Sequence, residues 1–365
     1  MQPREIILSN VERRNPPRPG LTFDRGRIDD ILLCSLSAHG FQQRRWIEGS
    51  REYYDDEWGN IWMRMVDGSR GGEIFRPAIE DWRQLDGMRV PDYTHPDCAA
   101  AMWETFSRPT DKFKLAFIGG WVFNDTRYLR KMEVYFADLA LYPDELRRLH
   151  EIVAGVYERK IRLAAATGAE GIFFCEDMGT QTGLFFSPRM FRHYFKELYA
   201  RLWGISHELG MKVFEHSCGQ NWAILPDLLD AGVNVFQLDQ PALYDMPALA
   251  ELLRARRRAV EPGGYPEDHA HRRPRADRSG CAEDGGTSLG RPDLQELRRL
   301  GRHRGARRVG RLGVSGDLQA GGGNGSRTPA PTCVGCRCGV TQLTQITRMT
   351  QTSRGSPIRV HPPNP

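Results

Sequence analysis

The sequence predicts an α/β fold built on a parallel sheet, a (β/α)8 barrel of the TIM type that is incomplete at its C-terminal strands. Apolar strand segments alternate with amphipathic helical segments over the first 253 residues, which is the rhythm of parallel sheets with helical crossovers. Polar side chains gather at the C-terminal ends of these strands, where barrel enzymes assemble their sites. The alternative, an open doubly wound sheet, usually binds a phosphate at a glycine-rich first turn, and the chain contains neither GxGxxG nor GxxxxGK.

Four apolar segments bounded by turn residues are the predicted strands. We expect them to be adjacent and parallel: residues 115–120, 171–177, 212–219 and 233–240. An amphipathic segment that begins after Pro143 and ends before Gly168 predicts the helix between the first two strands. Ser187 as N-cap, with Pro188 behind it, begins the next helix, and Gly210 ends it. Shorter helices are expected after each of the last two strands.

Composition divides the chain near Leu253. Residues 254–365 hold 21 Arg, no Lys and 9 acidic residues, a net charge of +12, and Tyr265 is their only aromatic residue. Residues 1–253 hold 30 basic and 37 acidic residues, a net charge of −7. A segment rich in Arg, Gly and Pro and poor in aromatic residues cannot bury enough apolar surface to offset its ordering entropy. We therefore expect residues 254–365 to be a disordered tail.

The tail is typical of GC-rich codons read out of frame, so we interpret it as the product of a frameshift near residues 254–260. The alternative is a natural basic tail that binds nucleic acid through its arginines. Those arginines are scattered among Gly and Pro, with almost no aromatic residues for base stacking, so no nucleic-acid partner is expected. The CVGCRCG run at 333–339 lacks a second ligand pair at zinc-finger spacing, which makes chance the simpler explanation.

Neither a membrane span nor a secretory signal is expected. No segment approaches the roughly 18 uninterrupted apolar residues that a membrane helix needs, and the start, MQPREIILSN, lacks the apolar stretch of a signal peptide. The eight cysteines are irregularly spaced, as individual thiols are. The sequence thus predicts a cytoplasmic protein without a membrane partner.

The stretch FEHSCGQN, residues 214–221, places His216 and Cys218 two apart at the end of a predicted strand. Residues two apart on a strand point to the same side, so an imidazole nitrogen and a thiolate converge at the barrel mouth. A third ligand from another strand could complete a zinc site with one position open for substrate. The alternative is a packed histidine beside a small buried cysteine. The flanking carboxylates and the position at the barrel mouth favour the site.

Three segments between about Tyr54 and Leu253 resemble the uroporphyrinogen decarboxylase superfamily, which also contains zinc-dependent corrinoid methyltransferases. They are YDDEWGNIW (54–62), EDMGTQTGLFFSPRMFR (176–192) and HELGMKVFEHSCGQNWAILPDLLDAGVNVFQLDQP (207–241). The resemblance implies a (β/α)8 barrel with its cleft at the C-terminal face. Together with the change in composition near Leu253, it divides the chain into a uroporphyrinogen decarboxylase-like domain, residues 1–253, and the tail, residues 254–365.

The branches of the superfamily differ at residues that can be inspected here. The decarboxylases carry an arginine-rich segment near the N-terminus that grips the carboxylates of a tetrapyrrole, whereas this chain reads NVERRNPPRPG, with Arg13 and Arg14 in another context. The methyltransferases carry a His-x-Cys zinc pair followed by a second cysteine. His216 and Cys218 match the pair; the second cysteine would fall in the tail, and neither Cys281 nor Cys333 is assigned to it.

The methyltransferase resemblance implies zinc as cofactor, bound weakly by this chain, and a corrinoid as co-substrate, with a small-molecule thiol substrate and a corrinoid protein as partners. Zinc would lower the pKa of the thiol, which then accepts the corrinoid's methyl group. Glu176 and Asp177 would orient substrate or act as acid and base, and Asp239 would hold the His216 ring. The alternative for each carboxylate is a cap on a loop or helix.

Two glutamines, Gln181 and Gln240, are the candidate substrate contacts. Three functions remain open at this point. The chain is a zinc- and corrinoid-dependent methyltransferase, a cofactor-free decarboxylase of a tetrapyrrole, or the inactive product of a damaged gene whose missing strands leave the barrel open.

Overall fold

The computed structural model describes residues 1–22, 28–67 and 72–258. They all belong to one compact unit of the chain. The last helix, α9 (Met246–Arg258), continues past the predicted domain end at Leu253. The rest of the tail, with Cys281 and Cys333, lies outside the described residues, so its disorder stays a prediction.

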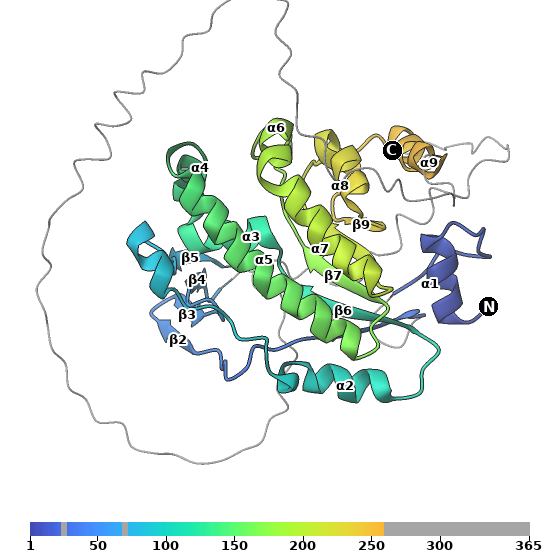
Figure 1. Ribbon diagram of the computed structural model, residues 1–365, viewed down its shortest axis with the longest axis horizontal. Helices are drawn as coiled ribbons and strands as arrows, with labels where there is room; N and C mark the ends of the chain where they lie inside the picture. The colour runs from blue at the N-terminus through green and yellow to red at the C-terminus, as the bar shows by residue number, and fades with distance from the viewer. Residues whose placement is uncertain (23–27, 68–71, 259–365) are drawn as a thin grey trace, which may run out of the picture. The chain divides into compact units, whose positions relative to one another are not determined.

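A parallel sheet of five strands forms the centre of the described structure (Figure 1). Its order is β1-β6-β7-β8-β9, and each neighbouring pair is parallel. The strands are β1 (Ile31–Ser35), β6 (Phe113–Gly119), β7 (Gly171–Cys175), β8 (Lys212–Ser217) and β9 (Val235–Leu238). The four strands predicted from the sequence are therefore confirmed as adjacent and parallel. Strand β1 was not among the strands predicted from the sequence.

The strand order follows the chain without a reversal, as in a barrel wound in one direction; a doubly wound sheet reverses its order at a switch point. Within the described ranges, however, β1 and β9 each pair on one side only. The fold is thus an α/β fold with a parallel sheet, consistent with the TIM type, and the described strands do not close into a barrel.

Helices begin and end largely where the local sequence predicts. Helix α5 (Pro143–Ala166) starts at its proline, and Gly168 follows it with φ +81°. The Ser187 hydroxyl accepts the Met190 N–H at 3.2 Å and caps α6 (Pro188–Phe191). The single helix expected there is interrupted by a π-helical turn, η3 (Arg192–Lys196), before α7 (Glu197–Glu208). The other α-helices within the described ranges are α1 (Pro3–Val11), α2 (Ala100–Ser107), α3 (Val122–Arg130), α4 (Met132–Leu141) and α8 (Leu225–Ala231).

The two faces of the parallel sheet bury different sets of side chains. One face packs against helices such as α5 and α7 and includes Val213 of β8. The other face carries a smaller cluster to which α1 contributes Ile7 and β8 contributes Phe214. Because side chains alternate along a strand, His216 lies on the same face as Phe214, and Glu215 lies on the helix-covered face.

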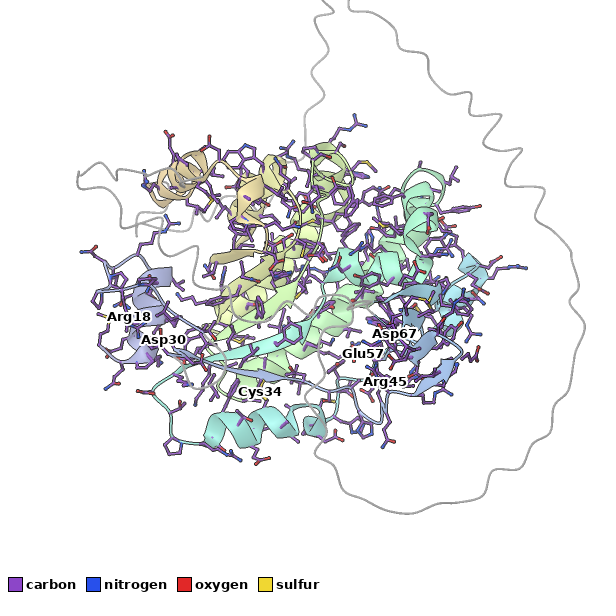
Figure 2. All side chains as sticks on the ribbon, turned by 180° about the vertical axis from the view of Figure 1, so that it is seen from behind. Arg18, Asp30, Cys34, Arg45, Glu57 and Asp67 are labelled. Carbon is purple, nitrogen blue, oxygen red and sulfur yellow. The ribbon has the colours of Figure 1, made fainter. Side chains whose placement is uncertain are left out.

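The bidentate pair of Arg18 with Asp30, at 2.6 and 2.8 Å, fixes the chain just before β1 (Figure 2).

A second sheet, which the sequence analysis did not predict, is antiparallel with the order β2-β3-β4-β5. Its strands are β2 (Arg45–Glu48), β3 (Arg51–Asp55), β4 (Ile61–Met65) and β5 (Glu73–Arg76). The motif YDDEWGNIW forms its central hairpin, whose turn is held by the Asp56 carboxylate through the N–H groups of Trp58 and Asn60 and the indole of Trp62. Lys160 of α5 pairs with Glu57 of this turn at 3.0 Å; Figure 2 labels Glu57.

Throughout the described ranges, every helix is too short or too polar to traverse a lipid bilayer.

Candidate functional site

His216 and Cys218 lie on the same side at the end of β8 and contact each other. The Cys218 sulfur is 3.4 Å from Nε2 of His216, and the ring is completely buried, with 0% of its surface exposed. The alternation of side chains along the strand brings both residues to the face that carries Phe214. One nitrogen and one sulfur are thus available at a single point.

Asp177, which follows β7, adds an oxygen to this pair. Its Oδ1 atom accepts the backbone N–H of Cys218 at 2.7 Å and lies 3.8 Å from Nε2 of His216. The ligand atoms of the three residues all lie within 4.8 Å of one another. Asp177 comes two residues after Cys175, the residue paired with His216 in the sheet, which explains why its side chain reaches this face.

The three side chains fit a zinc ion. Zinc accepts nitrogen, sulfur and oxygen ligands at about 2.0–2.3 Å, which separates tetrahedral ligand atoms by about 3.3–3.8 Å. The observed 3.4 Å and 3.8 Å separations fall within that range. Three protein ligands also leave the fourth tetrahedral position to a substrate, as in catalytic zinc sites. The cluster of Asp177, His216 and Cys218 is called the Asp-His-Cys cluster below.

Gln237 orients the His216 ring. Its side-chain oxygen contacts Nδ1 of His216, so a proton on Nδ1 is donated to Gln237 and Nε2 is left for an ion. The sequence suggests Asp239 for this contact, but Gln237 is the residue opposite His216 in the β8–β9 register. Asp239 is half-buried and donates its backbone N–H to Ser217. The pairing register of β8 with β9 determines which of Gln237 and Asp239 contacts the His216 ring, and local sequence does not reveal that register.

The proton on His216 is held firmly. Burial opposes a charged ring, but the contact with Cys218 and the negative charge of Asp177 outweigh it and raise the pKa of His216 to about 9. An ion bound at Nε2 must displace this proton, so ion binding here is coupled to pH.

Glu176 lies apart from the cluster, although it precedes Asp177 in the chain. Its buried carboxylate accepts the N–H groups of Phe123 and Asn124, both at 2.9 Å, and the Tyr199 hydroxyl. Phe123 and Asn124 belong to the first turn of α3, so these contacts are those of a helix cap. Burial raises the pKa of Glu176 to about 8.

The two predicted substrate contacts occupy different positions. Gln240 accepts the Gly219 N–H at 2.8 Å through Oε1 and so supports the backbone after Cys218. Gln181 is exposed in the loop after β7.

The loops that follow β7 and β8 touch through their backbones. The Gln220 N–H donates to the Thr180 carbonyl at 2.8 Å. Gly219 has φ +79°, and a Cβ atom there would lie 2.2 Å from the Gly179 carbonyl oxygen. The loop carrying Asp177 and the loop carrying Cys218 therefore form one frame.

Further support comes from residues that the sequence analysis missed. The Ser217 hydroxyl donates to the Glu176 carbonyl at 2.6 Å and accepts from the Asn221 amide at 2.6 Å. The Tyr244 hydroxyl donates to the Gly219 carbonyl at 2.8 Å. Ser217 and Asn221 lie in the same stretch, FEHSCGQN, as His216 and Cys218, and this proximity in the sequence is the signal that could have identified these two residues.

One other group of potential metal ligands occurs in the described ranges, formed by His39, His95 and Asp97. All three residues are exposed, and Nδ1 of His39 already lies 2.7 Å from the Asp97 carboxylate. The Asp-His-Cys cluster is more enclosed and includes a thiol, which makes it the stronger candidate for zinc.

Comparison with known proteins identifies the domain. Residues 63–258 match the sequence profile named "Uroporphyrinogen decarboxylase (URO-D)". Among solved structures, a methyltransferase from Methanosarcina mazei is similar, with 15% identity, a TM-score of 0.43, and coverage of 52% of this chain and 56% of that chain. The match thus spans about half the length of that protein. A search of curated proteins finds no match.

Proposed function

The chain belongs to the uroporphyrinogen decarboxylase family, and on that premise we propose that its Asp-His-Cys cluster binds zinc and serves methyl transfer between a corrinoid and a thiol. The observation that carries the proposal is the convergence of one nitrogen, one sulfur and one oxygen from two neighbouring strand ends within 4.8 Å. Enclosed His and Cys ligands beside a carboxylate are a donor set that suits zinc better than magnesium or calcium.

Each residue of the cluster has a distinct task in this function. His216 offers Nε2 because Gln237 engages its Nδ1 atom, and Cys218 offers its sulfur on the same side. Asp177 accepts the Cys218 backbone N–H through Oδ1, so it sets the position of the thiol and can also supply an oxygen ligand.

Zinc, when bound, would lower the pKa of a coordinated thiol substrate, so that a thiolate is available near neutral pH to accept a methyl group from a corrinoid. The chain's own part is to hold the substrate near the open ligand position and to limit access of water. The complete burial of His216 supports this, since a low-dielectric surrounding strengthens interactions between charged groups.

Cofactor-free decarboxylation of a tetrapyrrole is the alternative within the same family. That reaction needs cationic side chains for the substrate's carboxylates. Of the N-terminal arginines considered for this role, Arg14 pairs with Glu12 at 2.6 Å, and Arg13 contacts the Leu253 carbonyl oxygen. These contacts favour the zinc proposal.

Metal content tests the proposal directly. The full chain is loaded with Zn²⁺ or Co²⁺, dialysed and analysed for bound metal; Cys218→Ser is compared with Cys34→Ser, which alters a half-buried thiol of β1. We expect one ion per chain, a thiolate-to-cobalt absorption band, and loss of both in Cys218→Ser alone. A protein that retains no zinc, or one that binds equally well without Cys218, contradicts the site.

Methyl transfer is a separate measurement on the zinc-loaded chain. Methylcobalamin and 2-mercaptoethanol are supplied, and the loss of the methylcobalamin absorption is followed. We expect a rate that depends on zinc and on Cys218. Stoichiometric zinc without transfer would retain the metal site and overturn the methyltransferase function.

A further inference from the structure

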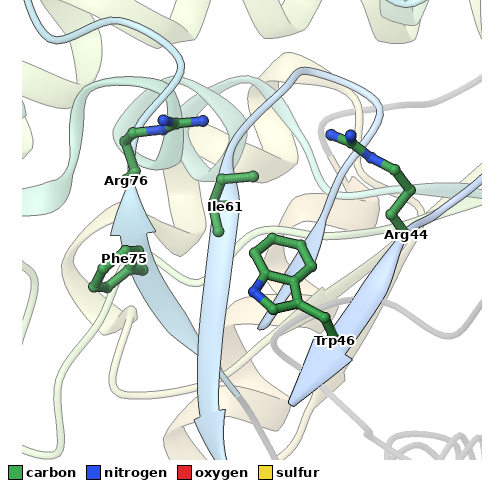
Figure 3. A pocket seen from close by; sticks show the side chains of 5 residues that line it. All are labelled: Arg44, Trp46, Ile61, Phe75 and Arg76. Atoms are coloured by element: carbon green, nitrogen blue, oxygen red, sulfur yellow. The ribbon is translucent and has the colours of Figure 1, made fainter. Parts of the chain in front are cut away.

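The antiparallel sheet carries a pocket that the proposed function does not use. It has a volume of about 380 Å³ and is lined by Arg44, Trp46, Ile61, Phe75 and Arg76. Figure 3 shows Arg44 and Arg76 extending toward each other above Ile61, with the rings of Trp46 and Phe75 on either side of the strand that carries Ile61. Two cationic groups thus lie at one end of the pocket and two aromatic rings flank its middle.

A β-bulge explains why two consecutive residues of β5 both reach the pocket. Ile61 pairs with Arg76 and Trp62 pairs with Ile74, so Phe75 is the extra residue of the bulge. A regular strand would send Phe75 and Arg76 to opposite faces, whereas a bulge redirects a side chain. Both residues are exposed and both line the pocket.

The aromatic wall is held in place from beneath. Trp46 stacks on Tyr53 with ring centroids 5.5 Å apart, and Phe75 meets the same Tyr53 ring edge-on at 5.1 Å. Tyr53 itself is buried. Trp46 and Phe75 are therefore two partly exposed rings on one fixed support, which lowers the entropy lost when a flat ligand contacts them.

The pocket carries an excess of positive charge. Nε of Arg44 donates to the Asp55 carboxylate at 2.8 Å, which leaves the outer nitrogens of that guanidinium for another acceptor. Among the residues that the structure describes, the Arg76 guanidinium has no hydrogen-bond or ion-pair partner; the contact of Arg76 with Ile61 is the backbone pairing of the two strands. A guanidinium matches the planar geometry of a carboxylate, phosphate or sulfonate and also stacks on aromatic faces.

We propose that this pocket binds a small aromatic anion, with its ring between Trp46 and Phe75 and its acidic group on Arg76 and the outer nitrogens of Arg44. The volume falls within the range of about 300–1,000 Å³ that is usual for small-molecule sites and suits a molecule of one or two rings. The proposal does not depend on zinc or on the Asp-His-Cys cluster, which lies on the other sheet.

Calorimetric titration of the full chain with 2-naphthoate tests the proposal, with 2-naphthalenemethanol as the neutral analogue of the same shape. We expect saturable binding of one naphthoate and weaker binding of the alcohol by about tenfold or more, since hydrogen bonds to charged groups are the stronger ones. Added salt should weaken the binding of the anion and leave the binding of the neutral alcohol unchanged. 2-Naphthyl phosphate, run in parallel, shows which acidic group binds better; tighter binding of either anion supports the proposal.

Variants separate the two halves of the pocket. Arg76→Gln should weaken the binding of naphthoate about tenfold and leave the affinity for the alcohol unchanged, whereas Trp46→Leu should weaken the binding of both ligands. Arg108→Gln, an exposed arginine of α2's C-terminal end, is the matched control and should change neither. Arg76 is exposed, so its variant is expected to fold, and circular dichroism verifies this. The proposal is overturned if binding is not saturable, if the acid and the alcohol bind equally well, or if Arg76→Gln binds naphthoate as well as the parent chain does.

Discussion

The Cys218 sulfur lies 3.4 Å from Nε2 of His216, so a single ion can be held by a side chain of β8 and the side chain that directly follows this strand. The pair depends on the orientation of the imidazole ring, because only one rotation aims Nε2 at the thiol. Gln237 from the neighbouring strand fixes that rotation through Nδ1. The pair on β8 is therefore completed from outside its own strand.

Replacement of Gln237 tests this dependence. Gln237→Met keeps the length of the side chain but removes the oxygen that engages Nδ1, and loss of such a partner typically costs 10–100-fold in metal affinity. We expect zinc affinity to fall by roughly that factor while the fold is kept. Competition with a chromophoric chelator measures it, and Gln181→Met, at an exposed loop position, serves as control. Equal affinities in the two variants would show that the ring is oriented by other contacts.

Glu176 is expected to make stability depend on pH. Burial raises its pKa from an ordinary value of 4.5 to about 8, so the folded state binds the proton more tightly than the unfolded chain does. The contribution to stability is complete below about 4.5 and is lost as pH rises through 8, by up to about 1.4 kcal/mol per pH unit.

Glu176→Gln cannot ionise, so its free energy of unfolding should fall less steeply over that pH range. Urea unfolding at a series of pH values measures the slope. Glu197→Gln, at an exposed position on α7, should retain the slope of the parent chain. If Glu176→Gln keeps the same slope, the raised pKa is not what governs the dependence.

Glu215 should be a site where an apolar substitution stabilises the protein. It is 1% exposed, and neither carboxylate oxygen has a hydrogen-bond partner among the described residues. Burial raises the pKa of Glu215 well above its ordinary value. Because an unsatisfied buried polar group costs roughly 1–3 kcal/mol, Glu215→Met should raise the free energy of unfolding by a similar amount.

Glu176→Met serves for comparison. Glu176 accepts two backbone N–H groups, so its replacement by Met should lower the free energy of unfolding. Chemical denaturation of both variants gives the comparison. A destabilised Glu215→Met would contradict the expected cost of the unpaired carboxylate.

Gly219→Ala should strain the frame that joins the two loops. The residue has φ +79°, and a Cβ atom would meet backbone atoms of Gly179 at 2.2 Å. We expect a loss of about 1–3 kcal/mol in the free energy of unfolding, together with weaker zinc binding. Gly183→Ala is the control, because a Cβ atom there meets nothing within 4 Å. Thermal unfolding and zinc titration of the pair decide the matter; similar results for both variants count against the close contact.

Much of the parallel sheet could be predicted because its strands are apolar runs bounded by turn residues. Strand β1, ILLCS, was not predicted although it is as long as β7, and the strands of the antiparallel sheet, such as REYYD and EIFR, mix charged and aromatic residues in runs of four or five. Such strands form through pairing with neighbours, and the pairing is not visible in local composition.

The candidate site also combines features that the local sequence predicts with features that depend on the assembled sheet. That His216 and Cys218 share a side follows from strand periodicity alone. The different positions of Glu176 and Asp177 depend on which face the helices cover, and the contact of Gln237 with His216 depends on the register of β8 with β9. Both are properties of the assembled sheet, so the sequence proposed Asp239 for a contact that belongs to a residue two positions earlier.

The backbone contact between the loops after β7 and β8 also bears on how long a bound ion stays. We expect an ion held by Asp177 and Cys218 at the proposed site to leave when one of these loops moves away, and the hydrogen bond from Gln220 to Thr180 joins the two loops. Escape therefore waits for a joint local opening of both segments, which is rarer than the fluctuation of a single loop. The close contact between Gly179 and Gly219 should thus slow both the entry and the release of an ion at the proposed site, even where its equilibrium affinity is unchanged.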